Sequence, residues 1–340
     1  MREIVIVIRD LYLQPGESPG ASVPGIGHLA RFGDETALPE GWRVWTARWL
    51  GLSQYADAAP ASIAAAALAD ALSDRAVWLA TPVHLIAGLT SLHFDRRSML
   101  RLREEDLGEL AASFGATFRD SGFELRPLAG GELLLLGQQV SPPATTTEPA
   151  RMLLTSVAES LPTGEGARAL RRLSAEIEMW LHGHPINDQL ARRGALTAAT
   201  LWLWGGGNLS APRPVATPKA ITDAAFGCDA YVHGLWRLAG GETRPMPVDW
   251  ASVIGEPRAE RALAVVEVAE LLQANASWSL ADAVAEIDRR VISPSIAALR
   301  RDGLDRLTLL ANDRCLSLRA ADHWRLWRRM RAHKGLEALT

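Results

Sequence analysis

The chain has 340 residues, of which 48% are hydrophobic and 22% charged, which is the composition of a globular protein with room for about two domains of ordinary size. Its net charge of −3 at pH 7 gives no overall attraction for nucleic acid, so we do not expect nucleic acid as a partner. Two cysteines, Cys228 and Cys315, are too few for a disulfide framework or a cysteine-based zinc site.

The first 76 residues have the pattern of an α/β protein. Residues 4–8 (IVIVI) are β-branched and apolar, which predicts a buried strand. Asp10 follows the carboxyl end of this strand, where the ligand sites of open α/β sheets gather, so it is the first candidate site residue. Helical spacing of apolar residues, or a high alanine content, predicts helices in 27–32, 42–50 and 58–72.

Residues 77–140 alternate strand and helix signals on a smaller scale. Residues 77–80 predict a strand that ends in a turn at 81–84, and residues 92–97 (LHFDRR) predict a short edge strand. A helix is expected at 104–114. Two apolar runs around Gly130 and Gly131 predict a β-hairpin, with strands at 123–127 and 132–136. The Pro-rich segment 141–149 is expected to be a loop.

The stretch 168–207 links a helix, a polar turn and a strand. Apolar residues at spacings of three and four predict an amphipathic helix over 168–181, which His182-Gly183-His184-Pro185 should end. The continuous apolar run 198–204 predicts a buried strand, which Gly205-Gly206-Gly207 should stop. Because a backbone without Cβ atoms can approach a ligand closely, this arrangement is typical of ligand clefts in α/β proteins.

The last third of the chain mixes helices with a short hairpin. Helices are expected at 231–241, 259–274 and 280–288, and two strands, 306–310 and 315–319, should flank a turn. The basic segment 323–334 (HWRLWRRMRAHK) predicts a docked C-terminal helix with a solvated basic face, which could bind a protein partner. Binding of RNA or anionic lipid by this segment is the less favoured interpretation.

No segment indicates export or membrane insertion. The opening apolar run, 1–8, is too short for a signal peptide and is followed at once by Arg9 and Asp10. No later apolar run approaches the length of a membrane span. Together with the low cysteine content, this predicts a cytoplasmic protein.

The order of short blocks along the chain resembles the archaeal-type cofactor-independent phosphoglycerate mutases of the alkaline phosphatase superfamily. The family has an HPVN-like block that is followed by a glycine and then by a turn. Residues 184–187, Gly194 and residues 204–207 of this chain resemble these three features. The family's opening strand, GIGRLAG segment and DxRAGR motif resemble residues 4–10, 234–240 and 95–97. The chain is also similar to a bacterial branch of phosphoglycerate mutase-like proteins that includes a regulator of pathogenicity factors, protein E.

The resemblance implies an alkaline-phosphatase-like α/β sheet flanked by helices and interrupted by a smaller α+β domain. We place the core at 1–76 and 200–340 and the inserted domain at 77–199. The implied chemistry is phosphoryl transfer through a serine phosphoenzyme and two divalent metals held by Asp and His ligands.

The residues that this chemistry requires are replaced. In the block that resembles the family's nucleophile segment, 41–53, Trp42 stands at the serine position and Thr46 at a histidine position. The segment 267–279, where further ligands are expected, contains neither Asp nor His. Ala199 and Trp204 replace a substrate-binding Asn and Arg.

The leading hypothesis is therefore a catalytically degenerate protein, regulatory or ligand-binding, that takes a small phosphorylated or carboxylated ligand. The alternative is an active phosphoglycerate mutase or phosphohydrolase with rearranged site residues, and only then with Mn or Zn as cofactor. Two histidines across a Gly-Pro turn more often satisfy a helix terminus than bind a metal, so no metal site or cofactor is predicted. Because the required catalytic residues are replaced, no catalytic residue is predicted either. The candidate binding residues are Asp10, His84, Arg96, Arg97, His182, His184, Asn187 and Asp188.

Overall fold

The computed structural model describes residues 2–13, 22–68, 75–89, 91–128, 130–137, 141–153, 156–208, 223–254, 260–301 and 303–324. The chain forms two compact units. The first contains Met1–Ser53, Lys219–Cys228 and Gly240–Thr340, and the second contains Gln54–Pro218 and Asp229–Ala239.

A seven-stranded mixed sheet forms the centre of the first unit, with the strand order β10-β9-β11-β1-β12-β13-β2. The first five of these strands are parallel, and β13 and β2 run antiparallel to their neighbours. The central strand β1 is buried on both faces, as its continuous apolar sequence predicts. The strands are β1 (Glu3–Ile8), β2 (Asp34–Ala37), β9 (Ala224–Phe226), β10 (Thr243–Arg244), β11 (Arg261–Val266), β12 (Arg306–Ala311) and β13 (Arg314–Arg319).

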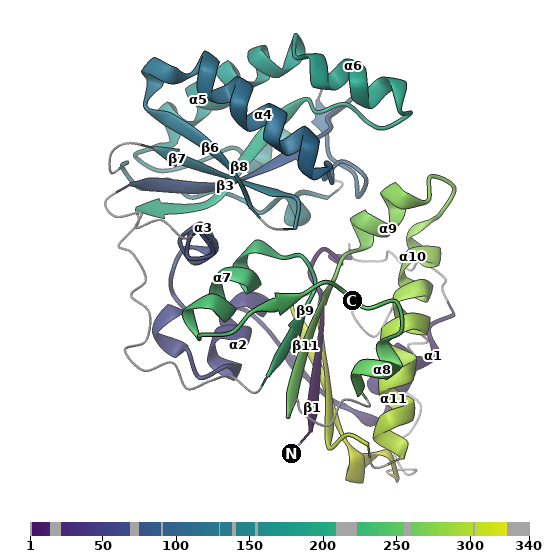
Figure 1. Cartoon of the computed structure of the whole chain (residues 1–340). Coiled ribbons are helices and arrows are strands. Elements are labelled where there is room, and N and C mark those ends of the chain that lie inside the picture. The colour runs from purple at the N-terminus through teal and green to yellow at the C-terminus, as the bar shows by residue number, and fades with distance from the viewer. Residues whose placement is uncertain are drawn as a thin grey trace. The chain divides into compact units, whose positions relative to one another are not determined.

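Helices cover both faces of this sheet (Figure 1). Ile4, Ile6 and Ile8 pack against five helices on one face, and α2 (Gly41–Trp49) lies on the other. A π-helical turn, Asp288–Ile292, joins two of the five helices. The five are α1 (Pro24–Phe32), α8 (Trp250–Ile254), α9 (Val268–Ala274), α10 (Leu280–Ile287) and α11 (Ser293–Arg300), and a 3-10 turn, Ala320–Trp324, follows β13.

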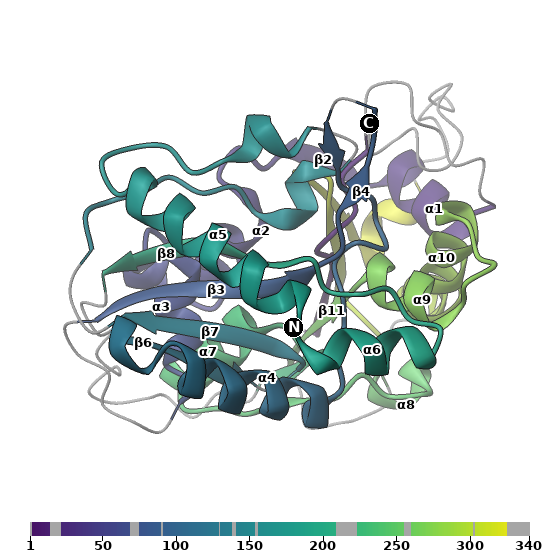
Figure 2. The same ribbon diagram turned by 90° about the horizontal axis from the view of Figure 1, so that it is seen from above.

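The second unit is built on an antiparallel sheet of four strands in the order β6-β7-β3-β8, which Figure 2 shows side by side. Helices α4, α5 and α6 cover one face, and α3 and α7 cover the other (Figure 1). The strands are β3 (Ala76–Val83), β6 (Phe123–Leu128), β7 (Glu132–Gly137) and β8 (Thr200–Asn208), and a separate small hairpin has β4 (Ile86–Ala87) and β5 (Leu92–His93). The helices are α3 (Pro60–Ala65), α4 (Glu104–Thr117), α5 (Ala167–His182), α6 (Pro185–Arg192) and α7 (Ala230–Leu238), with 3-10 turns at Ser53–Tyr55, Arg119–Ser121, Pro149–Met152 and Val157–Ser160.

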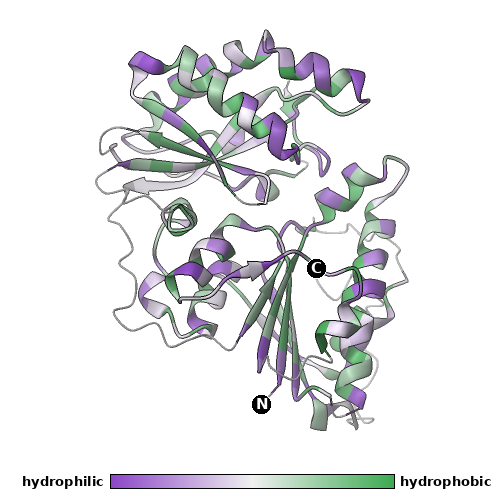
Figure 3. Cartoon of the chain, in the orientation of Figure 1, coloured by the Kyte–Doolittle hydropathy of each residue, from purple (hydrophilic) through white to green (hydrophobic). Residues whose placement is uncertain are grey.

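The hydropathy of the elements follows this layering. In Figure 3 the strands of both sheets are largely hydrophobic, whereas the helices carry hydrophilic residues along one side. In α5, for example, Leu170, Leu173, Ile177 and Leu181 are buried at helical spacing. Burial of such a stripe supplies most of the stability of a surface helix.

Two glycines of the second unit allow close packing. A Cβ atom at Gly206 would lie 2.0 Å from the indole of Trp78, so the second residue of the expected glycine stop makes room for a core side chain. A Cβ atom at Gly234 would lie 1.8 Å from the carbonyl oxygen of Ile63, where α7 crosses α3. Both glycines are therefore needed for packing within the unit.

The structure confirms the α/β class and most of the expected elements, corrects three of them and adds a helix. The expected helix over 259–274 is wrong in its first part, because β11 occupies Arg261–Val266 before α9 begins. A short apolar run fits a buried strand as well as a buried helix, and here strand pairing decides. β3 continues through the expected turn as far as Val83, β8 continues through the three glycines to Asn208, and α6 is an additional helix.

The second unit is wider than the expected insertion at 77–199. β8 pairs with β3 along most of its length, and α7 packs on α3, so both belong to this unit although they follow residue 199. Within the described residues, no helix is long and apolar enough to cross a membrane. Apart from its first two residues, the expected C-terminal helix at 323–334 lies outside the described residues.

Candidate functional site

His84 lies just beyond the end of β3, next to the chain segment that leads into β8. Its backbone N–H donates to the carbonyl oxygen of Ser98 at 2.8 Å, and its Nδ1 lies 2.9 Å from the carbonyl oxygen of Thr197. A carbonyl oxygen can only accept a hydrogen bond, so Nδ1 carries a proton. The backbone therefore holds the half-buried imidazole in one orientation.

The loop Asp95–Ser98 brings two arginines to the same strand end. The Asp95 carboxylate accepts hydrogen bonds from the Arg97 backbone N–H at 2.8 Å and from the Ser98 hydroxyl at 3.0 Å. This closes a tight polar turn of the kind that aspartate favours. Arg96 is buried and Arg97 half-buried. Because Ser98 also bonds the backbone of His84, the turn and the histidine are parts of one corner, which we call the His84 corner (His84, Asp95–Ser98 and Thr197).

Asn187 fixes this corner from the other side. Its Oδ1 accepts from the Ala198 backbone N–H at 2.8 Å, and its Nδ2 donates to the carbonyl oxygens of Leu181 and Ala198 at 2.9 and 3.0 Å. All of these bonds go to the backbone, so Asn187 ties the end of α5 to the entry of β8. Thr197, whose carbonyl oxygen bonds His84, directly precedes Ala198, so His84 and Asn187 form hydrogen bonds with adjacent residues.

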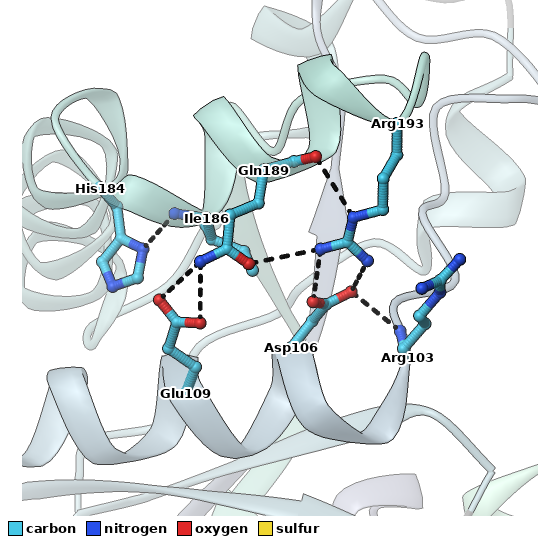
Figure 4. A network of polar contacts seen from close by, with 7 residues as sticks. All are labelled: Arg103, Asp106, Glu109, His184, Ile186, Gln189 and Arg193. Atoms are coloured by element: carbon cyan, nitrogen blue, oxygen red, sulfur yellow. Dashed lines mark hydrogen bonds and ion pairs between the residues drawn. The ribbon is translucent and has the colours of Figure 1, made fainter.

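His184 has a structural role as the N-cap of α6. Its Nδ1 accepts the backbone N–H of Ile186 at 3.1 Å, and its ring packs edge-on against Trp180 with 4.9 Å between ring centroids (Figure 4). Burial lowers the pKa of His184 from its ordinary value, which favours the neutral ring. His184 is 6% exposed, whereas His182 and Asp188 point to solvent. His184 and Asn187 therefore point inward and anchor the backbone of this turn, whereas the side chains of His182 and Asp188 are exposed.

A polar network joins α6 to α4 beside this cap (Figure 4). Arg193 donates two hydrogen bonds to the Asp106 carboxylate, at 2.9 and 2.7 Å, and the Gln189 amide donates to Glu109 at 3.1 Å. The Arg193 guanidinium holds the pKa of Asp106 below its ordinary value. The sequence analysis did not predict this pair. Asp106 is the third residue of α4, where an aspartate can close a capping box, and that position is recognisable in a sequence.

Asp10 belongs to the first unit and to a different environment. Its two carboxylate oxygens accept the backbone N–H groups of Val268 and Ala269, both at 2.7 Å, at the start of α9. Burial, and next the negative charge of Glu267, raise the pKa of Asp10 to about 6. Glu267 is paired with Arg9 at 2.5 Å, and burial also raises the pKa of Glu270 nearby. Asp10 thus lies at the strand end that the sequence indicated, but its carboxylate is engaged by a helix.

Backbone contacts of Ser98, Thr197 and Ala198 thus place four of the eight predicted residues on neighbouring segments, namely His84, Arg96, Arg97 and Asn187. Asp10 belongs to the other unit, His184 caps a helix, and His182 and Asp188 are exposed. Among the described residues, no three His, Cys, Asp or Glu side chains gather in a way that could hold a metal ion. Thr197 and Ser98 complete the corner through backbone carbonyls, which leave no trace in a sequence.

No family model matches the chain. Over 134 residues, 39% of its length, the chain is 28% identical to a probable 2,3-bisphosphoglycerate-independent phosphoglycerate mutase of Geobacter sulfurreducens, and the match spans only 33% of that protein.

Two solved structures are similar over most of the chain. A cofactor-independent phosphoglycerate mutase from Thermoplasma acidophilum has a TM-score of 0.40 and 16% identity, with 94% of this chain and 90% of that chain covered. The PH0037 protein from Pyrococcus horikoshii has a TM-score of 0.48 and 14% identity, with 99% and 92% covered.

Proposed function

We propose that the chain is a phosphoglycerate mutase-like protein that lacks the catalytic chemistry of the mutases and acts as a regulatory or ligand-binding module. The partial match to the Geobacter sulfurreducens protein, which is named a probable mutase, supports the first half of this proposal. The second half depends on what the side chains at the expected catalytic positions do in this fold.

The observation that carries the proposal is the role of Trp42 and Thr46 in α2. These residues stand where the block order places a serine nucleophile and a histidine. Trp42 is 5% exposed and packs under the guanidinium of Arg43, and Thr46 is fully buried with its hydroxyl donating to the Trp42 carbonyl oxygen at 2.8 Å. An indole cannot accept a phosphoryl group, and the threonine hydroxyl is already used within the helix.

Asp10 supports the same conclusion. A carboxylate that serves as a metal ligand must offer its oxygens to the cation. Here both oxygens accept backbone N–H groups of α9, and the pKa of about 6 means that the side chain is partly protonated near that pH. Its contacts and its protonation both suit a helix anchor.

The His84 corner is the best candidate for the ligand site. Two arginines and a histidine offer hydrogen-bond donors and positive charge that fit a small anion, such as a phosphorylated or carboxylated metabolite. The turn of Asp95 and the clamp of Asn187 fix the backbone around these side chains, so little order needs to be gained on binding.

The first test asks whether the chain is an enzyme. The purified protein is analysed for Mn, Zn and Mg and assayed for phosphoglycerate mutase and phosphatase activity with Mn added. We expect neither stoichiometric metal nor turnover above the blank. Turnover together with about two metal ions per chain, as in two-metal phosphoryl-transfer sites, would replace this proposal with that of an active mutase or phosphohydrolase that uses Mn or Zn.

The second test concerns the ligand. Calorimetric titration with 3-phosphoglycerate should show saturable binding that H84A and R97A each weaken by about tenfold, the range for a hydrogen bond to a charged group. R168A removes an exposed arginine of α5 outside the corner and serves as the matched control. Equal affinities of the wild type, H84A and R97A would exclude the corner as the anion site.

We further propose a cytoplasmic location, since two cysteines in 340 residues are too few for the disulfide framework of a secreted protein. A protein partner bound through 323–334 remains part of the proposal. Pull-down from a cell extract with the full chain and with a truncation after residue 322 tests it, because only the full chain should retain the partner.

A further inference from the structure

A hollow of about 220 Å³ lies in the second unit between α5 and strands β3 and β6 of the four-stranded sheet. Its floor is apolar and partly aromatic, and is formed by Trp78 of β3, Phe123 of β6, and Leu170 and Leu173 of α5. Arg172 and Glu176 stand at its rim. The hollow is separate from the His84 corner, since the two share no residue.

The shape of the floor is built into the backbone. A register shift in the pairing of β3 with β8 falls at Trp78, and the absence of a Cβ atom at Gly206 makes room for the indole. The ring of Phe123 is tilted by 56° against that of Trp78, with 6.5 Å between centroids. Two aromatic side chains from different strands are thus held in a fixed arrangement, which favours a planar apolar group beside them.

The volume sets the size of the occupant. An apolar protein cavity of roughly 150 Å³ holds one benzene molecule. The hollow is somewhat larger, so it has room for one aromatic ring with a short side chain and is too small for a fused polycyclic ligand with substituents.

The rim sets the charge of the occupant. Arg172 is 83% exposed, and its Nε donates to the Glu176 carboxylate at 2.9 Å. No other interaction of Arg172 occurs within the described part of the chain, so both terminal Nη groups can point two parallel N–H donors at a carboxylate. Glu176 is already paired with Arg172 and repels an anion, so Arg172 is the group that gives the hollow its preference for a carboxylate.

We propose that this hollow binds a small aromatic carboxylate, with the ring against Trp78 and Phe123 and the acid on Arg172. The site is independent of the proposed function, because neither the ring floor nor the rim includes a residue of the His84 corner. A compound such as phenylacetate has the required ring, reach and charge, and phenylacetamide is its uncharged isostere.

The test is a titration of the full chain with phenylacetate, followed by saturation-transfer NMR on the ligand protons. We expect saturable binding of one molecule per chain. A169W should abolish it, because Ala169 lines the hollow and a larger side chain there fills it. A175W is the matched control, since Ala175 is another exposed alanine of α5 that does not line the hollow, and it should bind as the wild type does.

The charge preference gives a second measurement that does not depend on A169W folding. R172A should weaken phenylacetate by about threefold, as expected for an exposed ion pair, and should remove the preference over phenylacetamide, whereas E176Q should tighten phenylacetate. H84A should leave all of these values unchanged. Absence of saturable binding, binding to A169W equal to that of A175W, or an acid preference that survives R172A would each overturn the proposal.

Discussion

Two buried aspartates, one in each unit, respond to burial in opposite ways. Asp10 is 3% exposed and Asp106 is 4% exposed, and both accept backbone N–H groups near a helix start. Burial raises the pKa of Asp10 to about 6, whereas the two hydrogen bonds from Arg193 lower that of Asp106. Burial alone therefore does not decide the charge of these carboxyl groups.

The difference lies in the neighbours. Asp106 faces a guanidinium that offers two parallel donors and a full positive charge. Asp10 faces two neutral amides and the Glu267 carboxylate, and the nearest cation, Arg9, is paired with Glu267. A buried carboxyl group with its own arginine stays ionised, while one that shares its surroundings with a second carboxylate tends to keep its proton. The two units should consequently respond to pH in opposite directions.

The largest expected effect is the pH dependence of the first unit. Because the folded pKa of Asp10 is raised from 3.8 to about 6, the folded state binds more protons than the unfolded state between these values. The contribution of Asp10 to the free energy of unfolding, about 3 kcal/mol, is then fully present below about pH 4 and is lost as the pH rises through 6. Hydrogen exchange of peptides covering 260–274, measured from pH 4 to 7, reports this loss.

The matched variant for that measurement is D10N, which cannot titrate. Its exchange protection, corrected for the intrinsic rate, should lack the Asp10 slope over this range. A slope of equal size in D10N would assign the pH dependence to another group, of which Glu270 is the nearest with a raised pKa.

The next effect concerns Asn187, a neutral anchor with no charge to titrate. N187A removes three hydrogen bonds to backbone groups of Leu181 and Ala198 and should destabilise the second unit by about 2–3 kcal/mol, with no change in pH dependence. Chemical denaturation monitored by exchange in 181–204 measures it.

N187D sharpens the same contrast. A carboxylate at this position would face the carbonyl oxygens of Leu181 and Ala198, so the variant should regain stability at acid pH, where the group is protonated. An N187D protein with the pH profile of the wild type would show that Asn187 does not make these contacts in solution.

A smaller effect is expected at the pair of Asp106 and Arg193. Both D106A and R193A should destabilise the second unit by about 1 kcal/mol, because the Arg193 side chain is 28% exposed and solvent weakens the pair. The folded pKa of Asp106 is depressed, so this contribution is present above about pH 4 and disappears as the pH falls through the folded pKa. R193K keeps the charge but not the two parallel donors and should fall between the wild type and R193A.

The smallest effect belongs to E267Q. Removing the Glu267 charge takes away the second cause of the raised pKa of Asp10 and releases Arg9, so the midpoint of Asp10 should move down from about 6 without reaching its ordinary value. Carboxyl NMR of Asp10 measures the shift. An unchanged midpoint would show that burial alone sets the pKa.

Much of the fold was predictable from local sequence patterns. The apolar run of β1, the amphipathic stripe of α5, and the hairpin of β6 and β7 were each predicted close to their observed positions. The errors lie where a short apolar segment fits two structures, as in 259–274, or where a turn signal is overridden by pairing, as at Gly205–Gly207 in β8. In both cases long-range strand contacts outweigh local preference.

The candidate site was predictable only in part. The sequence by itself determined the residue types, with a histidine, two arginines and an asparagine between residues 84 and 187. The family resemblance predicted Trp42 and Thr46 at the positions of catalytic groups. The sequence could not show that His84 meets the carbonyl oxygen of Thr197, because these residues are 113 positions apart and the contact arises from the pairing of β3 with β8. Nor could it separate the inward His184 and Asn187 from the outward His182 and Asp188. Hydrophobic periodicity is a local property that a sequence carries openly, whereas hydrogen bonds to backbone groups and the pKa of a buried acid depend on which distant segments fold against it, and only the tertiary structure decides that.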